Sequence, residues 1–259
     1  MSITKIEQKM MGGRNRLQLA LQKDFQSKGF YRQGASLAGN RLVKTLTAAL
    51  DGRVNEDRYK RSFQEPEVTA SVSITLDISG SMDSAINRGG KSKYEEVVAC
   101  AYALSAILRK MGVEVSVALC DFAQDPCNQG TTMPIIYPLV WGGKEVVPIG
   151  DALKVSPQAG TLVSAYAWAA VEMAEQSTAH HRLALYMTDG QCSSSGECKS
   201  IARQALKSGI RLVGVVYESS WEVPSIDDHP HATRATTPEE FGGVILHHLA
   251  EVVKGKGEV

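Results

Sequence analysis

The stretch Ser71-Val72-Ser73-Ile74-Thr75-Leu76-Asp77-Ile78-Ser79-Gly80-Ser81 decides the fold of this chain. Its first six residues are rich in β-branched side chains and contain neither Pro nor Gly, which predicts a buried strand over residues 71–77. The strand delivers Asp77, Ser79 and Ser81 to the loop at its C-terminal end, where ligands collect in open α/β sheets. One carboxylate and two hydroxyls on a tight turn suit a small, hard cation such as Mg²⁺.

Size and composition indicate an ordinary globular protein. The 259 residues suffice for one α/β domain with an extension, and 43% of them are hydrophobic against 22% charged. No run approaches the ~20 apolar residues that cross a bilayer, and the first residues lack the apolar segment of a signal peptide. The five cysteines show no framework spacing. We therefore expect a cytoplasmic protein.

Charge is distributed unevenly along the chain. Residues 1–65 carry 13 Lys and Arg against 6 Asp and Glu, a balance of +7, so the rest of this neutral chain carries −7. Apolar residues at helical spacing, such as Leu17, Leu21 and Phe25, predict a basic, mainly helical N-terminal extension over 1–65, followed by a domain over 66–259. The basic region could meet nucleic acid, an acidic partner or the acidic body of its own chain. Nucleic acid is the less favoured of these, because no aromatic-interleaved basic motif accompanies the charge.

Predicted strands and helices alternate after residue 66. The apolar patterns place strands at 71–77, 114–120, 133–140, 183–187 and 211–217, and helices at 94–111, 162–176, 197–208 and 238–254. Pro134 and Pro138 favour a position at the rim of the sheet for residues 133–140. This alternation predicts an α/β fold with a doubly wound, Rossmann-like, mostly parallel sheet covered by helices on both faces.

Two further polar residues fall where they can join the first three. Thr161 follows Gly160 at the start of a predicted helix, and Asp189 follows a predicted strand in Thr188-Asp189-Gly190. An Asp-x-Ser-x-Ser pattern alone is more often a helix cap or a turn than a metal site. Two carboxylates and three hydroxyls from three loops can instead fill an octahedral shell together with water, which favours the metal site.

Other kinds of site fit the sequence less well. The stretch Gly89-Gly90-Lys91-Ser92 is like the end of a phosphate-binding P-loop, but Ala85 stands where the first Gly is required. No Gly-x-Ser-x-Gly elbow is present, and an Asp-x-Asp phosphotransferase would need a carboxylate where Ser79 stands. Cys192 and Cys198 lack the spacing of zinc ligands and are expected to be solvated loop cysteines. Binding, and not an enzymatic activity, is therefore the expectation.

The pattern Asp77-x-Ser79-x-Ser81, with Thr161 and Asp189, resembles the metal-ion-dependent adhesion site of the von Willebrand factor A (vWA) domain. The resemblance covers residues from about 70 to 255. It implies that Ser79, Ser81 and Thr161 approach the ion directly, while Asp77 and Asp189 hold it mainly through water. The implied ion is Mg²⁺, with Mn²⁺ or Ca²⁺ as alternatives.

Within that family the chain is most similar to the C-terminal vWA domain of the cobaltochelatase T subunit. Three stretches carry this similarity: Gly112-Val113-Glu114-Val115, His181-Arg182-Leu183 and Pro238-Glu239-Glu240-Phe241-Gly242-Gly243. The resemblance implies Mg²⁺-dependent recognition of a protein partner that offers an Asp or Glu. It also implies an adaptor role beside a ring-forming AAA+ ATPase of the MoxR or chelatase type.

Two alternatives stay open from the sequence. The chain could be a chelatase subunit that takes part in inserting a metal into a tetrapyrrole. It could also be an adaptor that associates with nucleic acid through residues 1–65. Neither alternative involves a membrane.

Overall fold

The chain divides into two compact units. One comprises Leu21–Val68, and the other comprises Met1–Ala20 and Thr69–Val259. The computed structural model describes residues 30–31, 36–37, 59–60, 69–85, 90–124, 132–158, 160–190, 195–217 and 231–253. The smaller unit contains a three-stranded antiparallel sheet of order β1-β3-β2, formed by β1 (Phe30–Tyr31), β2 (Ser36–Leu37) and β3 (Tyr59–Lys60). The rest of region 1–65, for which the sequence predicts helices, lies outside the described residues. The boundary near residue 66 stays a prediction.

The larger unit is built on a seven-stranded sheet of order β10-β9-β8-β4-β5-β6-β7. Its strands are β4 (Ala70–Asp77), β5 (Glu114–Gln124), β6 (Thr132–Trp141), β7 (Lys144–Glu145), β8 (His181–Thr188), β9 (Ile210–Tyr217) and β10 (Thr233–Ala235). The five strands from β10 to β5 run parallel, and β6 and β7 are antiparallel to their neighbours. The predicted doubly wound, mostly parallel sheet is confirmed.

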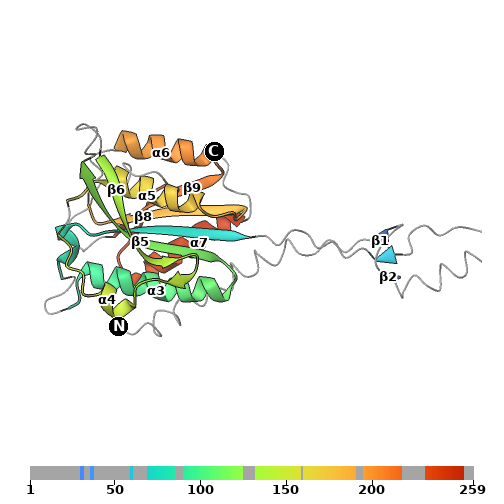
Figure 1. Ribbon diagram of the computed structural model, residues 1–259, viewed down its shortest axis with the longest axis horizontal. Helices are drawn as coiled ribbons and strands as arrows, with labels where there is room; N and C mark the ends of the chain where they lie inside the picture. Colours follow the sequence, from blue (N-terminus) through green and yellow to red (C-terminus); the bar gives the residue numbers. More distant parts are fainter. Residues whose placement is uncertain are drawn as a thin grey trace, which may run out of the picture. The chain divides into compact units, whose positions relative to one another are not determined.

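Helices cover both faces of this sheet (Figure 1). They are α3 (Lys93–Lys110), α4 (Ile149–Ala152), α5 (Val163–Glu175), α6 (Ser195–Lys207) and α7 (Pro238–Val253). On one face α3 packs against α7, and on the other α5 packs against α6. All four predicted helices are confirmed, with ends within two residues of the expected ones. The short elements α4, β7 and β10 were absent from the prediction, because two to four residues carry too little periodicity to read.

The strand predicted at the rim is one place inward from the edge. β6 pairs with β5 along its length, and only its last two residues pair with β7, Val140 with Glu145 and Trp141 with Lys144. Pro134 and Pro138 lie outside the part that β7 covers. Their missing N–H groups therefore cost no hydrogen bond on that side.

Local sequence explains where α3 begins and ends. Ser92 accepts a hydrogen bond from the backbone N–H of Glu95, and the Glu95 carboxylate accepts one from the backbone N–H of Ser92. Ser92 is therefore a helix cap and not part of a phosphate loop. At the other end, Gly112 takes a φ of +79°, a conformation open to glycine, and its N–H donates to the carbonyl of Arg109.

The central strand β4 is buried on both faces. Val72, Ile74 and Leu76 point to one face of the sheet, and the small polar residues that alternate with them point to the other. On that second face, the Thr75 hydroxyl donates to the carbonyl of Tyr166 in α5 at 2.9 Å. Because side chains alternate along a strand, Asp77 emerges on the same face as Thr75, toward α5.

One prediction about the cysteines was wrong. Cys198 is fully buried, whereas a solvated loop position was expected. The reason is that α6 begins at Ser195, so Cys198 lies in its first turn and faces the hydrophobic cluster that includes residues of α5. Cys192 lies outside the described residues. Cys100 and Cys120, expected in the core, are both fully buried.

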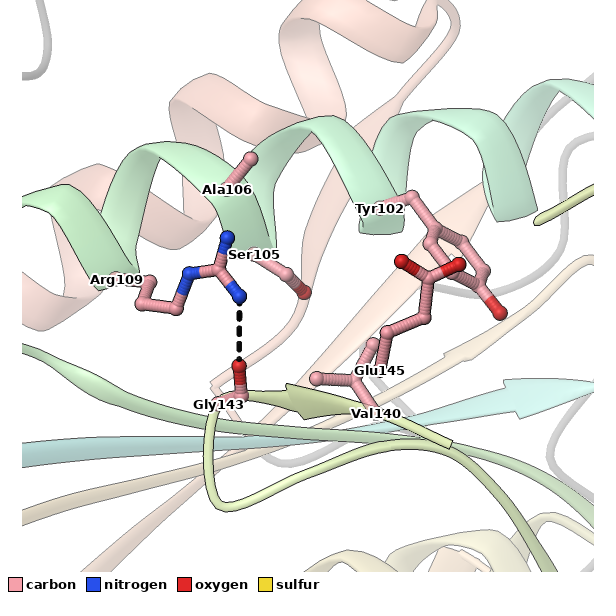
Figure 2. A pocket seen from close by; sticks show the side chains of 7 residues that line it. All are labelled: Tyr102, Ser105, Ala106, Arg109, Val140, Gly143 and Glu145. Atoms are coloured by element: carbon pink, nitrogen blue, oxygen red, sulfur yellow. Dashed lines mark hydrogen bonds between the residues drawn. The ribbon is translucent and has the colours of Figure 1, made fainter. Parts of the chain in front are cut away.

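A small pocket separates α3 from the turn between β6 and β7 (Figure 2). On one side of it Arg109 donates from Nη1 to the carbonyl of Gly143 at 3.2 Å. Tyr102, which also lines the pocket, donates its hydroxyl to the carbonyl of Val147 at 2.6 Å. The two bonds connect the segment from Gly143 to Val147 with α3. Among the described helices, none is both long and apolar enough to span a membrane.

Candidate metal centre

The candidate site lies where β4 and β8 end. β4 pairs with β5 on one side and with β8 on the other, and the chain reaches these neighbours through helices on opposite faces. This is a topological switch point, the place where doubly wound sheets bind ligands. Asp77 is the last residue of β4, and Asp189 directly follows the last residue of β8. The two carboxylates therefore flank the switch point.

Asp77 is fully buried and held by three donors. Its Oδ1 accepts the backbone N–H of Ser79 at 2.6 Å and lies 3.1 Å from the hydroxyl of Tyr166, whose one hydrogen it shares with the carbonyl of Gly160 at 2.9 Å. Its Oδ2 accepts the hydroxyl of Thr188 at 2.6 Å. Burial raises the pKa of Asp77, whereas the hydrogen bonds from Thr188 and Ser79 act in the opposite direction and the nearby charge of Asp189 raises it further. The carboxylate is thus fixed in orientation by its supports.

Ser79 and Ser81 form a short chain of oxygens with Asp189. Ser79 Oγ lies 3.0 Å from Ser81 Oγ, and Ser81 Oγ donates to Asp189 Oδ1 at 2.7 Å. Ser79 precedes a 3-10 helix, η1 (Gly80–Asp83), but its side chain makes no capping hydrogen bond there. The helix-cap explanation for this pattern is therefore wrong at Ser79. The turn explanation holds at Asp77, because the bond from the Ser79 N–H to Asp77 Oδ1 forms an Asx-turn.

Lys93 joins the site from the first residue of α3. Its ammonium lies 2.5 Å from Asp189 Oδ2, and the two side chains are 9% and 1% exposed. The backbone N–H of Lys93 donates to the carbonyl of Ser84 at 3.1 Å. This bond ties the start of α3 to the turn that carries Ser81.

Thr161 lies beside the loop that carries Asp189. A Cβ on Gly190 would come within 2.9 Å of Thr161 Cγ2, a distance too short for an ordinary contact. Only glycine at position 190 lets the two loops approach this closely. Thr161 is exposed, and the N–H of Gly190 donates to Thr188 Oγ1 at 3.0 Å. The structure thus brings all five predicted site residues to one edge of the sheet.

Comparison with known proteins identifies the fold. No protein-family model matches the chain, and no curated protein matches it. Among solved structures, the PilB minor pilin from Streptococcus sanguinis has a TM-score of 0.52 and 11% identity, over 77% of this chain and 66% of the pilin. The pilus adhesin SpaC from Lactobacillus rhamnosus GG has a TM-score of 0.48 and 12% identity, over 74% of this chain and 31% of the adhesin. The SpRpn10 VWA domain has a TM-score of 0.45 and 10% identity, over 73% of this chain and 98% of that domain.

The chain has a vWA-like fold. The likeness to the PilB pilin supports the fold alone, because the identity is 11%. The chain spans only part of the adhesin and of the pilin, 31% and 66% of their lengths. The closer similarity to the cobaltochelatase T subunit stays a prediction from the sequence.

The donor set of this site fits a small, hard cation. In an octahedral shell with ligands at about 2.0–2.1 Å, neighbouring oxygens lie about 3.0 Å apart. The 3.0 Å between Ser79 Oγ and Ser81 Oγ matches that separation. Among the described residues, no three His, Cys, Asp or Glu side chains gather. A cation here would be held by hydroxyls and two carboxylates, which suits Mg²⁺ or Mn²⁺ better than thiolate- or imidazole-preferring metals.

Three residues at the site were not found from the sequence: Tyr166, Thr188 and Lys93. Thr188 stands directly before Asp189 and could have been found, because it is the last residue of β8, at the edge of the sheet where ligands collect. Tyr166 lies in the first turn of α5 and gave no signal beyond its place in an apolar helix. Lys93 did give one: a positive charge at the first position of a helix opposes the helix dipole.

Proposed function

We propose that this chain is a divalent-cation-dependent protein-recognition module. Its metal centre would comprise Asp77, Ser79, Ser81, Thr161 and Asp189, with Mg²⁺ as the preferred ion. The observation that carries this proposal is the chain of oxygens from Ser79 through Ser81 to Asp189, with neighbouring separations of 3.0 and 2.7 Å. The Ser79 hydroxyl, at the N-cap of η1, makes no capping hydrogen bond there.

The chain's own residues prepare the site for binding. Thr188, Tyr166 and the backbone N–H of Ser79 hold the Asp77 carboxylate in one orientation. Ser81 bridges the β4 and β8 loops by its bond to Asp189, so the two carboxylates keep a fixed spacing. A bound cation would supply a Lewis-acidic position that accepts a carboxylate oxygen from outside the chain. Recognition of an Asp or Glu on a protein partner follows from that chemistry.

The finer role rests on the sequence resemblance. It supports a cytoplasmic adaptor that binds its partner without chemistry on a substrate, beside an AAA+ ATPase that supplies ATP hydrolysis. The chelatase and nucleic-acid alternatives draw no support from the geometry of the described residues.

The proposal is tested by capturing partners from native lysate. Immobilised full-length chain is used in buffer containing Mg²⁺ and in buffer containing EDTA, beside a Ser79→Ala/Ser81→Ala variant. We expect captured proteins to be lost with EDTA, to return when Mg²⁺ is restored, and to be absent from the double variant. Ser208→Ala is the matched control, because Ser208 is an exposed serine two residues before β9, at the opposite edge of the sheet.

Thermal unfolding of each variant is measured first, so that loss of capture is not mistaken for loss of fold. A set of partners that is the same with Mg²⁺, with EDTA and in the double variant would contradict metal-bridged recognition. Loss of partners in Ser208→Ala as well would contradict the assignment of the effect to Ser79 and Ser81.

A further inference from the structure

The charges at the candidate site do not cancel. Asp77 and Asp189 carry two formal negative charges, and the Lys93 ammonium adds one positive charge 2.5 Å from Asp189 Oδ2. The site without a cation therefore carries one net negative charge. With a divalent cation it carries one net positive charge. Without Lys93, the same two states would be doubly negative and neutral.

The position of Lys93 is costly, which indicates a function. Lysine is almost never fully buried, yet Lys93 is only 8% exposed. It occupies the first residue of α3, where the helix dipole disfavours a cation, while Glu95 and Glu96 in the same turn have the favoured sign. Conflicts between local preference and structure concentrate at functional sites.

The backbone places Lys93 at the site firmly. Its N–H donates to the Ser84 carbonyl, three residues after Ser81, and Ala85 forms a β-bridge with Ser92 directly before it. The Ser92 capping box fixes the first turn of α3. The backbone at Lys93 is therefore tied to the turn that carries the Ser81 hydroxyl.

We propose that Lys93 sets the sign of the charge at the metal centre. It thereby lowers the affinity of the site for the cation and raises the affinity of the cation-loaded site for the partner's carboxylate. This inference rests on the proposed function. Its ammonium competes with a cation for the field of Asp189, which weakens cation binding. Once a cation is bound, the same ammonium leaves the site net positive, so it attracts an incoming carboxylate that the cation-free site repels. Lys93 thereby makes carboxylate binding conditional on the cation.

The two effects have opposite signs in one variant, which makes the test sharp. Mn²⁺ binding to the full chain is measured by the loss of the free-ion electron paramagnetic resonance signal. Lys93→Met is expected to bind Mn²⁺ roughly tenfold more tightly than the wild type, because one buried positive charge is gone. Acetate, the carboxylate probe, is then titrated into each Mn²⁺-loaded protein and followed by water-proton relaxation. Its affinity is expected to fall several-fold in Lys93→Met.

Matched variants separate charge from shape. Lys93→Arg keeps the charge, so its affinities for Mn²⁺ and for acetate should both stay close to those of the wild type. Lys154→Met removes a lysine from an exposed pair with Asp151 and should change neither affinity. Lys93→Gln repeats the test with a polar side chain if Lys93→Met folds poorly.

The outcomes distinguish this inference from the proposed function. Mn²⁺ binding that is equal or weaker in Lys93→Met and Lys93→Gln would overturn the role of Lys93 and leave the metal centre intact. Unchanged or stronger acetate binding in those variants would also overturn it. Failure of the wild type and of every Lys93 variant to bind Mn²⁺ would overturn the proposed function and this inference with it.

Discussion

Two lysine–aspartate pairs of the larger unit have nearly the same geometry and opposite surroundings. Lys93 and Asp189 lie 2.5 Å apart with side chains 9% and 1% exposed, whereas Lys154 and Asp151 lie 2.7 Å apart with side chains 77% and 59% exposed. The first pair joins residues 96 positions apart, and the second joins neighbours in and just after α4. From the distance between the charged atoms alone, the two pairs would be expected to contribute equally to stability.

The difference teaches that burial, and not contact distance, decides what such a pair does. An exposed pair gains little, because water already solvates both charges. In a buried pair each charge is stabilised by its partner in place of water. Removing one partner therefore leaves the other charge buried and unpaired. Comparing a variant of a buried group with a variant of an exposed one tests this lesson, from the largest expected effect to the smallest.

Removal of the lysine should separate the pairs most clearly. Lys93→Met leaves the Asp189 carboxylate buried without the Lys93 ammonium, and we expect the free energy of unfolding to fall by about 3 kcal/mol. Lys154→Met should lower it by less than about 1 kcal/mol. Denaturant unfolding of both variants in EDTA measures the two losses. Equal losses would contradict the assignment of the difference to burial.

Removal of a buried hydrogen bond beside the pair should have the next largest effect. Thr188→Val keeps the shape of the side chain but takes away the donor to Asp77 Oδ2 and the acceptor of the Gly190 N–H. We expect a loss of about 1–3 kcal/mol in the free energy of unfolding, because a buried carboxylate oxygen is left without its partner. Thr178→Val, at an exposed threonine, is the control. A loss no greater than the control's would show that Asp77 finds another donor.

Neighbouring histidines extend the comparison to pH. His248 is 8% exposed and His247 is exposed, and burial, helped by Arg211, lowers the pKa of His248 from 6.5 to about 4. The unfolded chain therefore takes up this proton first, and the stability that neutral His248 contributes is lost as pH falls from about 6.5 to about 4. We expect a loss on the order of 1 kcal/mol per pH unit within that range.

Unfolding measured across the same pH range checks this loss. His248→Gln should flatten the profile, and His247→Gln should change it little. A profile that His247→Gln flattens as much as His248→Gln does would contradict the attribution to the buried ring.

Salt should have the smallest effect and should act on the exposed pair alone. In a double-mutant cycle on Lys154 and Asp151, we expect the coupling energy of a few tenths of a kcal/mol to vanish in 1 M salt, where screening acts over about 3 Å. The same cycle on Lys93 and Asp189 should keep most of its coupling energy, because water and ions do not surround that pair. Equal loss of coupling in both cycles would show that ions reach the Lys93 pair.

The sequence predicted the features that local patterns encode. Strand β4 was evident from its β-branched run, and the place of Asp77 at its end followed from that strand. The alternation of strands and helices sufficed for the doubly wound sheet. The sheet brought Asp189 toward Asp77, because carboxyl ends of parallel strands share an edge. Thr161 joins them because it stands just before α5, the helix that leads into β8.

Features that depend on distant contacts were beyond the sequence. Lys93 meets a residue 96 positions away, and no local pattern names that partner. Tyr166 reaches Asp77 only because α5 crosses the face on which Asp77 emerges. Cys198 was assigned to the solvent because the first turn of α6 is polar in sequence, although one side of that turn packs on α5.

The two borders of the seven-stranded sheet have a consequence for association. One outermost strand, β7, is two residues long and consists of Lys144 and Glu145, and the other, β10, is three residues long. Such short or charged borders offer a foreign strand too few free backbone groups to extend the sheet. Growth by strand addition is therefore disfavoured at β7 and β10, although β6 extends well beyond the two residues that β7 pairs. Pro134 and Pro138 lie in that uncovered part of β6 and remove two N–H groups from its backbone.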